Sequence, residues 1–174
     1  MPDFSESITI AAPPADVYAQ VSDLSRMGEW SPECTRVTWT SPGPPALGSR
    51  FIGHNRAGAI RWFTQGEVVE AVPGERFSFR IRFGPVPIAL WTYTFTTPVT
   101  EDAASGGASA SRAADGGGTT GSDGDCLVTE SWTDHRPAAL RTAFGWIFGD
   151  RAKRNQYGIH KTLANLKTSL ELPT

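Results

Sequence analysis

Hydrophobic and polar residues alternate with a period of two along several stretches of the chain, which is typical of β-strands with one buried face. The clearest stretch is 76–83 (RFSFRIRF), whose aromatic and aliphatic residues fall on one phase. In 88–96, Trp91, Tyr93 and Phe95 alternate with threonines. Further strands are predicted at 4–10, 36–40, 49–55, 61–71 and 127–133. Because short turns separate most of these strands, we expect an antiparallel sheet.

Apolar residues at helical spacing predict helices on either side of this β-rich region. Pro13 and Pro14 suit the first turn of a helix, where backbone N–H groups lack partners in any case. A short helix is expected to about residue 24, and a second one over 25–30. Near the C-terminus, a helix of about 20 residues, ~30 Å long, is predicted. Its apolar stripe consists of Ala152, Ile159, Leu163, Leu166 and Leu170.

The composition is that of a globular domain, since 39% of the 174 residues are hydrophobic and 20% are charged. The formal net charge of -2 gives no general attraction for nucleic acid, so no nucleic-acid partner is expected. No apolar run reaches about 18 residues and no secretory signal precedes the first strand, so we expect no membrane span. We expect a cytoplasmic protein in which Cys34 and Cys126 are free thiols.

Residues 100–125 depart from the alternating pattern, because none of them is large and apolar. They consist only of Gly, Ala, Ser, Thr, Asp, Glu and Arg. Such a segment cannot bury enough surface to offset the entropy lost on ordering. We therefore predict a single domain over 1–174, in which 100–125 is a flexible Gly/Ala/Ser-rich insertion in the hairpin between the last two strands.

Several segments carry a resemblance to a known family: 8–33 (ITIAAPPADVYAQVSDLSRMGEWSPE), 50–56 (RFIGHNR), 68–79 (VVEAVPGERFSF), 127–134 (LVTESWTD) and 163–171 (LANLKTSLE). Together with the order of the elements, they resemble the START-like, helix-grip SRPBCC superfamily, in its polyketide cyclase/dehydratase and lipid-transport branch. The resemblance implies an α+β fold, with a curved antiparallel sheet around a long C-terminal α-helix and two short helices after the first strand. It also implies a cavity between sheet and helix. The superfamily hosts carriers, enzymes and chaperone regulators, so the fold does not select one activity.

Aromatic residues on the inward phase of the strands are candidates for lining this cavity, because small-molecule sites are mostly apolar. The alternative for each of them is an ordinary packed core. The ligand-binding candidates are Phe51, Trp62, Phe79, Trp91, Tyr93, Phe95 and Trp132 on strands and Ile159 and Leu163 on the helix. Gly158 lies within that helix, where glycine costs ~1 kcal/mol relative to alanine, and closeness to the sheet or to a ligand would explain it.

Polar residues on the inward phase are the candidates for chemistry. If Trp132 points inward, so does Glu130, because residues two apart share one face of a strand. A lone buried carboxyl group is costly and its pKa should rise, so Glu130 is the leading candidate for a general acid or base. Asn55 and Tyr93 are expected to hydrogen-bond a ligand carbonyl group or oxyanion. The alternatives for Glu130 are an ion pair with Arg61 or another base, or a solvated strand edge.

The chain carries no motif of a nucleotide site, a metal centre or a nucleophilic triad, and its three histidines are widely spaced. We therefore expect neither a metal nor another cofactor. The expected function is binding of a small hydrophobic, polyketide- or lipid-like molecule in an internal cavity, with cyclisation or dehydration by acid–base chemistry as the associated reaction. Two alternatives stay open: a non-catalytic carrier or sensor, and a protein-interaction module with a filled interior. The sequence makes no prediction of the oligomeric state.

Overall fold

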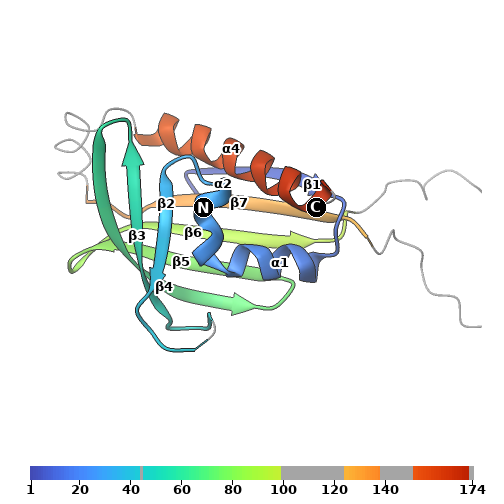
Figure 1. The fold of residues 1–174 in the computed structure, drawn as a ribbon, viewed down its shortest axis with the longest axis horizontal. Coiled ribbons are helices and arrows are strands. Elements are labelled where there is room, and N and C mark those ends of the chain that lie inside the picture. The colour runs from blue at the N-terminus through green and yellow to red at the C-terminus, as the bar shows by residue number, and fades with distance from the viewer. Residues whose placement is uncertain (44, 99–123, 138–150, 173–174) are drawn as a thin grey trace, which may run out of the picture.

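A computed structural model describes residues 1–43, 45–98, 124–137 and 151–172. Within these residues, one antiparallel sheet of seven strands faces one long helix, as Figure 1 shows. The strands are β1 (Phe4–Ile10), β2 (Cys34–Trp39), β3 (Arg50–Ala57), β4 (Ile60–Val72), β5 (Arg76–Phe83), β6 (Val86–Thr96) and β7 (Cys126–Asp134). The helices are α1 (Pro14–Ser22), the 3₁₀ turn η1 (Leu24–Arg26), α2 (Met27–Trp30) and α4 (Arg151–Glu171).

The sheet is a meander in which each strand from β2 to β7 pairs with the next one along the chain. β1 then pairs with β7, so the strand order is β1-β7-β6-β5-β4-β3-β2. The hairpin turns at Gly58 and Gly84 have φ angles of 60° and 57°, a conformation that glycine adopts without steric penalty. The predicted antiparallel sheet is confirmed, and the bounds of its strands differ from the predicted ones by only a few residues.

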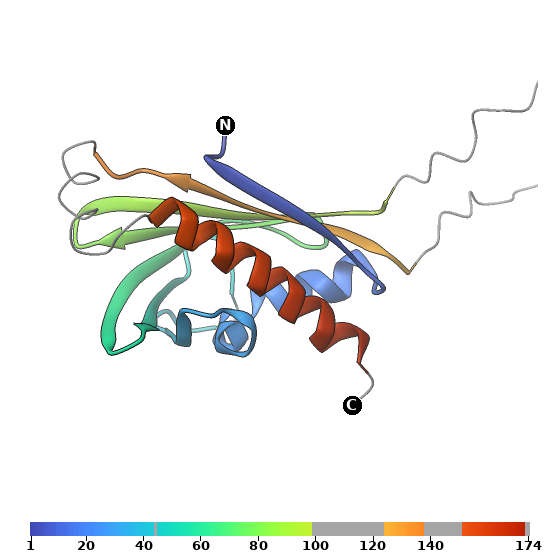
Figure 2. The same ribbon diagram turned by 90° about the horizontal axis from the view of Figure 1, so that it is seen from above.

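Helix α4 crosses the concave face of the sheet in both ribbon views and packs mainly against β1 (Figures 1 and 2). Ile159, Leu163 and Leu166 are completely buried there. Ala152 is exposed, contrary to its predicted place in the apolar stripe. It lies in the first turn of α4, ahead of the buried face, which begins at Asn155. The long C-terminal helix itself is confirmed.

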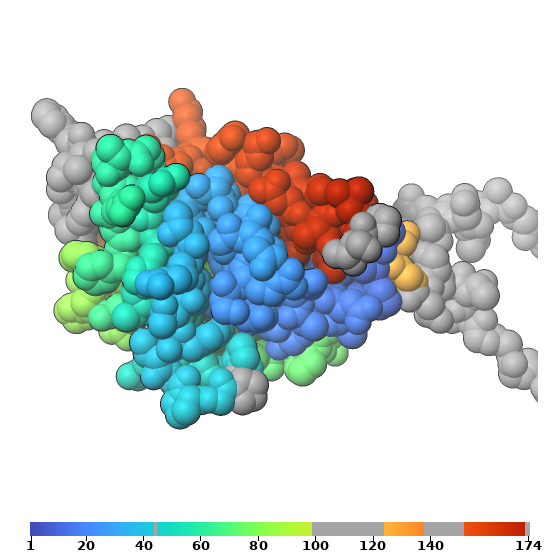
Figure 3. Space-filling model, viewed as in Figure 1, coloured from blue at the N-terminus to red at the C-terminus, as the bar shows by residue number. Residues whose placement is uncertain are grey.

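The short helices after β1 cover more of the same face. Val17 and Val21 of α1 are buried, and the ring of Tyr18 lies edge-on against Phe77 and Phe95 at centroid distances of 6.2 and 5.6 Å. α2 packs against both β2 and α4. In Figure 3, the short helices, the edge strand β2 and α4 lie in front of the central strands of the sheet and cover most of them. The structure therefore confirms the helix-grip α+β fold.

The predicted insertion at 100–125 lies almost entirely outside the described residues. The strands on either side of it, β6 and β7, pair in register from Ala89–Asp134 to Thr96–Leu127. Over the ranges that the structure describes, none of the helices has the length and apolar character needed to cross a membrane.

Candidate functional site

A cavity of about 490 Å³ lies between the sheet, the short helices and α4. Its volume falls within the range of about 300–1,000 Å³ that is usual for small-molecule sites. The wall is mainly apolar, and its aromatic side chains, besides Tyr93, are Phe51, Trp62, Phe79, Phe83, Trp91 and Trp132. The interior is therefore hollow, which argues against a protein-interaction module with a filled interior.

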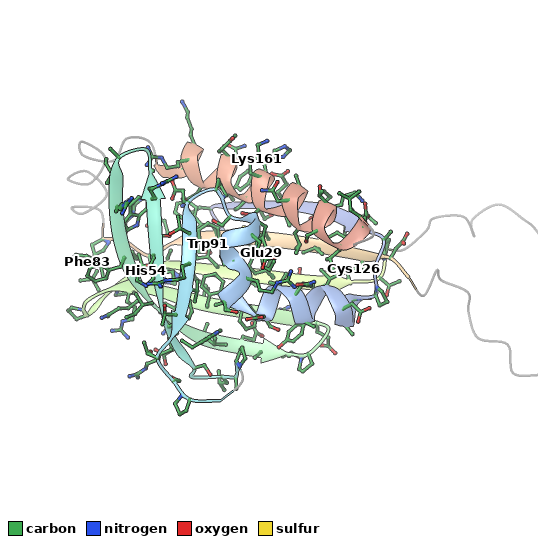
Figure 4. All side chains as sticks on the ribbon, viewed as in Figure 1. Glu29, His54, Phe83, Trp91, Cys126 and Lys161 are labelled. Carbon is green, nitrogen blue, oxygen red and sulfur yellow. The ribbon has the colours of Figure 1, made fainter. Side chains whose placement is uncertain are left out.

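The cavity occupies one end of the sheet, and a packed core occupies the other. Figure 4 shows Phe83 at one end of the sheet, Cys126 at the opposite end and Trp91 between them. Phe83 and Trp91 line the cavity, whereas Cys126 and Phe95 are buried in the core. The ring of Tyr18 on α1 packs against Phe95, so side chains fill the space between sheet and helix where α1 covers the sheet.

Most of the predicted ligand-binding residues lie on the cavity wall: Phe51, Trp62, Phe79, Trp91, Tyr93 and Trp132. The other three do not line the cavity. Phe95 packs beneath α1, and Ile159 and Leu163 are buried in the core where α4 meets the sheet. Their placement differs from the prediction because the phase of a residue indicates the face that it occupies but not its position along the strand or helix.

The position of Phe51 in the wall depends on a glycine of the neighbouring strand. Phe51 of β3 pairs with Gly66 of β4, and a Cβ atom built at Gly66 would lie 2.1 Å from Cζ of the Phe51 ring. The missing side chain at Gly66 therefore makes room for the ring. Trp39 and Phe79 enclose that ring further, at centroid distances of 5.4 and 5.6 Å.

Glu130 and Tyr93 form a hydrogen-bonded pair on the cavity wall. They are partners in the β6–β7 register, which places their side chains next to each other on one face. The Tyr93 hydroxyl donates to Glu130 Oε1 at 2.7 Å, and each residue is 2% exposed. Glu130 Oε2 is buried and has no hydrogen-bond partner among the described residues. Arg61 is a candidate ionic partner of Glu130 from the sequence. It instead lies near the β3–β4 turn, opposite Arg56 in the strand register.

The surroundings of Glu130 favour its neutral form. Burial raises the pKa of Glu130 to about 8; the hydrogen bond from Tyr93 opposes this shift, and the charge of Glu6 adds to it. Burial and the neighbouring Glu130 raise the pKa of Tyr93 well above its usual range. At neutral pH, Glu130 is therefore mainly a carboxylic acid, and its buried Oε2 atom has no hydrogen-bond partner among the described residues. Such a group can hydrogen-bond or protonate a ligand.

Glu6 of β1 stands directly opposite Glu130 in the β1–β7 register. Its Oε1 atom lies 2.7 Å from Nδ1 of His160 on α4, so its side chain lies on the helix-covered face. Side chains that are paired in this way lie on the same face, so the two carboxyl groups are near neighbours. The negative charge of Glu6 therefore disfavours ionisation of Glu130.

Replacing Glu6 with glutamine is expected to lower the pKa of Glu130 from its value of about 8. Because this pKa is raised above the unfolded value of 4.5, the stability that the neutral group contributes is complete below pH 4.5 and is lost as the pH rises through about 8. In Glu6→Gln this loss should be smaller and end at lower pH. Urea unfolding across this range measures it, with Glu130→Gln as the reference that lacks the titration. Identical profiles for Glu6→Gln and the wild-type protein would contradict the assignment.

Asn55 lines the cavity from β3 but is not bonded to the Tyr93–Glu130 pair. Its Nδ2 atom donates to the carbonyl oxygen of Gly53 at 3.2 Å and to Thr64 Oγ1 at 3.4 Å. A Cβ atom at Gly53 would lie 3.0 Å from Thr64 Oγ1, so this glycine makes room for its polar neighbours. The structure thus brings all three predicted catalytic residues to one cavity and directly joins two of them.

Polar residues of α4 also line the cavity, and sequence reasoning missed them. Arg154, Asn155 and Thr162 are on the wall, together with Gly158. Asn155 and Thr162 are 6% and 5% exposed. The spacing of these residues is helical and places them on one face, but an apolar stripe does not include polar residues.

The charged groups of the described cavity wall, Glu130 aside, have partners within the protein. Arg154 Nε lies 3.6 Å from Glu33 Oε1, and Arg136 contacts both carboxylate oxygens of Asp134 at 2.9 and 2.7 Å. Burial raises the pKa of the Cys34 thiol, also on the wall, to about 11, so it is not a thiolate at neutral pH. In the described ranges, no group of three or more His, Cys, Asp or Glu side chains is placed to hold a metal ion.

Known proteins are similar to this chain over nearly its whole length. The sequence profile of the family described as "Polyketide cyclase / dehydrase and lipid transport" matches residues 1–171. None of the curated proteins matches the chain.

Solved structures share the fold. A Polyketide_cyc-like protein from Corynebacterium glutamicum is 31% identical, with a TM-score of 0.54 over 97% of this chain and 90% of that one. A protein from Chromobacterium violaceum is 18% identical, with a TM-score of 0.63 over 98% and 97% of the two chains. The di-domain ARO/CYC BexL from the BE-7585A biosynthetic pathway is 17% identical, with a TM-score of 0.62. That match covers 98% of this chain and 50% of BexL.

Proposed function

The chain belongs to the polyketide cyclase/dehydrase and lipid transport family, and on this basis we propose that its cavity binds a small, uncharged hydrophobic molecule, polyketide- or lipid-like. The observation that carries the proposal is the Tyr93–Glu130 pair, a neutral acid on the wall of an apolar cavity. The pair is suited to a ligand carbonyl or hydroxyl group, because Glu130 Oε2 lacks a partner among the described residues. The remaining wall charges are paired, which favours an uncharged ligand.

The reaction that this geometry supports is loss of water from a β-hydroxy ketone. Glu130 protonates the departing hydroxyl group, and the carboxylate so formed accepts a proton from the carbon next to the carbonyl group. Water leaves, a carbon–carbon double bond forms and the acid is regenerated. The hydrogen bond from Tyr93 stabilises the transient carboxylate, since it favours the ionised form of Glu130. Asn55 also lines the cavity, and its amide donates to the ligand carbonyl group in exchange for its long hydrogen bond to Thr64. The aromatic wall holds the chain folded, which is also what ring closure requires.

A non-catalytic carrier or sensor is the second candidate. It is favoured by one observation: apart from Glu130, the titratable groups that the described wall presents are ion-paired or held neutral. Glu33, Arg136 and Arg154 are paired, and the thiol of Cys34 has a raised pKa. The site therefore offers a single acid for both proton transfers. Binding alone needs no more than the cavity and this hydrogen-bond donor.

Binding of a ketone is expected to weaken as the pH rises through about 8, because an ionised Glu130 cannot donate a hydrogen bond. The probe is fluorenone, a rigid aromatic ketone, and titration calorimetry measures its affinity at several pH values. Glu130→Gln keeps a donor at every pH, so its affinity should not change over this range. Tyr93→Phe removes a hydrogen bond that lowers the pKa of Glu130, so its midpoint should move to higher pH.

The groups around Glu130 that affect this titration are Tyr93 on β6, Glu6 on β1 with His160 of α4 against it, and Cys34 on β2, which acts on Tyr93. Fluorenone affinity that falls equally with pH in the wild-type protein and in Glu130→Gln would exclude Glu130 as the donor. Complete absence of binding at low pH would exclude the cavity as a site for aromatic ketones.

Turnover separates the enzyme from the carrier. The aldol adduct of benzaldehyde and acetone is a β-hydroxy ketone, and its dehydration product absorbs strongly in the near ultraviolet. An enzyme accelerates this reaction, and Glu130→Gln removes the acceleration. A carrier binds the adduct and releases it unchanged.

A further inference from the structure

The cavity has a polar wall on the helix side that the proposed chemistry does not use. Asn155 and Thr162 lie on α4 and line the cavity opposite the strands. Both residues are more than nine-tenths buried. Neither side chain makes a hydrogen bond to a residue in the described ranges, and the polar atoms of both remain accessible from the cavity that they border.

Asn165 and Thr168 are residues of the same types on the same helix, and each makes a hydrogen bond within the protein. The Nδ2 atom of Asn165 donates to the carbonyl oxygen of Trp30 at 2.9 Å and so ties α4 to α2. The hydroxyl of Thr168 donates to the carbonyl oxygen of Ala164 at 2.9 Å within the helix. Asn155 has no such anchor in the described part of the chain. Asn155 and Thr162 thus contribute no hydrogen bond that holds the described residues together, and their polar groups face the cavity instead.

Gly158 lies between these residues and opens the space in front of them. A Cβ atom built at Gly158 would meet nothing within 4 Å, although the residue is in the middle of a helix and lines the cavity. Asn155, Gly158 and Thr162 therefore form a polar ledge on the helix side of the cavity wall. We call these three residues the α4 ledge.

We propose that the α4 ledge is a second polar subsite, in which Asn155 and Thr162 hydrogen-bond an uncharged oxygen group of the ligand while the sheet wall binds another. This inference rests on the proposed binding function and names the residues that set its specificity. The amide of Asn155 offers both a donor and an acceptor, and the hydroxyl of Thr162 does the same. The preferred partner is therefore a hydroxyl group, which also donates and accepts. Charged groups are disfavoured, because the arginines of the described wall already have carboxylate partners.

The test compares fluorene, fluorenone and the set of ring-hydroxylated fluorenones by titration calorimetry at neutral pH. At least one hydroxylated isomer should bind the wild-type protein about tenfold more tightly than fluorenone. Asn155→Leu should remove this gain while it leaves fluorene and fluorenone within about twofold of their wild-type affinities. Thr162→Val should reduce the gain in part. The matched controls are Gln156→Leu and Thr168→Val, which alter exposed positions of α4 and should leave the gain intact.

Thermal unfolding distinguishes a binding role of Asn155 from a structural one, because loss of a structural residue would lower the Tm. Asn155→Leu replaces an amide that has no hydrogen bond to a described residue with an apolar side chain on a mainly apolar wall, so its Tm should rise by a few degrees. Asn165→Leu breaks the bond to Trp30 and should lower the Tm. For Asn155→Leu we therefore expect a higher Tm, together with loss of the extra affinity for hydroxylated fluorenones.

The outcomes separate this inference from the proposed function. If fluorenone binds but no hydroxylated isomer gains affinity, or if the gain survives in the double variant Asn155→Leu/Thr162→Val, the α4 ledge is not a subsite. A lower Tm for Asn155→Leu would likewise overturn it, since Asn155 would then be structural. If neither fluorene nor any fluorenone binds the wild-type protein, the proposed function fails and this inference fails with it.

Discussion

Replacing Gly66 with alanine is expected to lower the free energy of unfolding by about 3 kcal/mol, at the upper end of the usual cost of overpacking. The added Cβ atom would lie 2.1 to 2.5 Å from three atoms of the Phe51 ring. That ring is 4% exposed and is held by Trp39 and Phe79, so it has little freedom to move aside. Urea unfolding followed by tryptophan fluorescence measures the loss.

Two comparisons make this prediction specific. Gly158→Ala adds the same methyl group in open space within a helix, so it should stabilise the protein by up to about 1 kcal/mol. Phe51→Leu removes the atoms that clash, so Gly66→Ala should cost much less in that background than in the wild-type protein. Equal costs in both backgrounds would show that the clash with Phe51 is not the cause.

Filling the cavity from the helix side should abolish ligand binding and leave the fold intact. Gly158→Phe is expected to weaken fluorenone binding by at least about 100-fold, because a helical side chain leans toward the preceding turn and would cover the space beside Asn155. The free energy of unfolding should stay at or above the wild-type value, since phenylalanine has a better helix propensity than glycine and the site is open. Calorimetry measures the fluorenone affinity and urea unfolding measures the stability, both on the same preparation.

Gly158→Ala is the control, since it removes the helix penalty but adds only one methyl group. It should keep most of the affinity for fluorenone. Undiminished binding to a well-folded Gly158→Phe protein would place the ligand outside the cavity.

The alternating pattern of the strands was sufficient to predict the sheet and the faces of its residues. Trp132 and Glu130 share a phase, and both indeed line the cavity. The hydrogen-bond partner of Glu130 could not be predicted, because it depends on the register between β6 and β7, which no local pattern reveals. The sequence offered Arg61, whereas the register brings Tyr93 next to the carboxyl group.

Position along an element was harder to predict than the face it presents. Phe95 has the same phase as Tyr93, but it lies where α1 covers the sheet, so it is part of the core. The places of Asn155 and Thr162 were not predictable for a different reason. A polar residue on a buried helix face interrupts the apolar stripe from which the face is recognised, and only the cavity explains why it is there.

The neighbourhood of β1 affects how the chain folds while it is being synthesised. β1 pairs with β7 in a register that joins Phe4 to Trp132, and its other neighbour, α4, is made later still. The first strand therefore leaves the ribosome long before either partner exists, and such long-range pairing slows folding. Until α4 emerges, the aromatic wall of the cavity faces water. The nascent chain thus passes through a stage with an open strand edge and an exposed apolar surface, which is the stage at which chaperones protect a protein from aggregation.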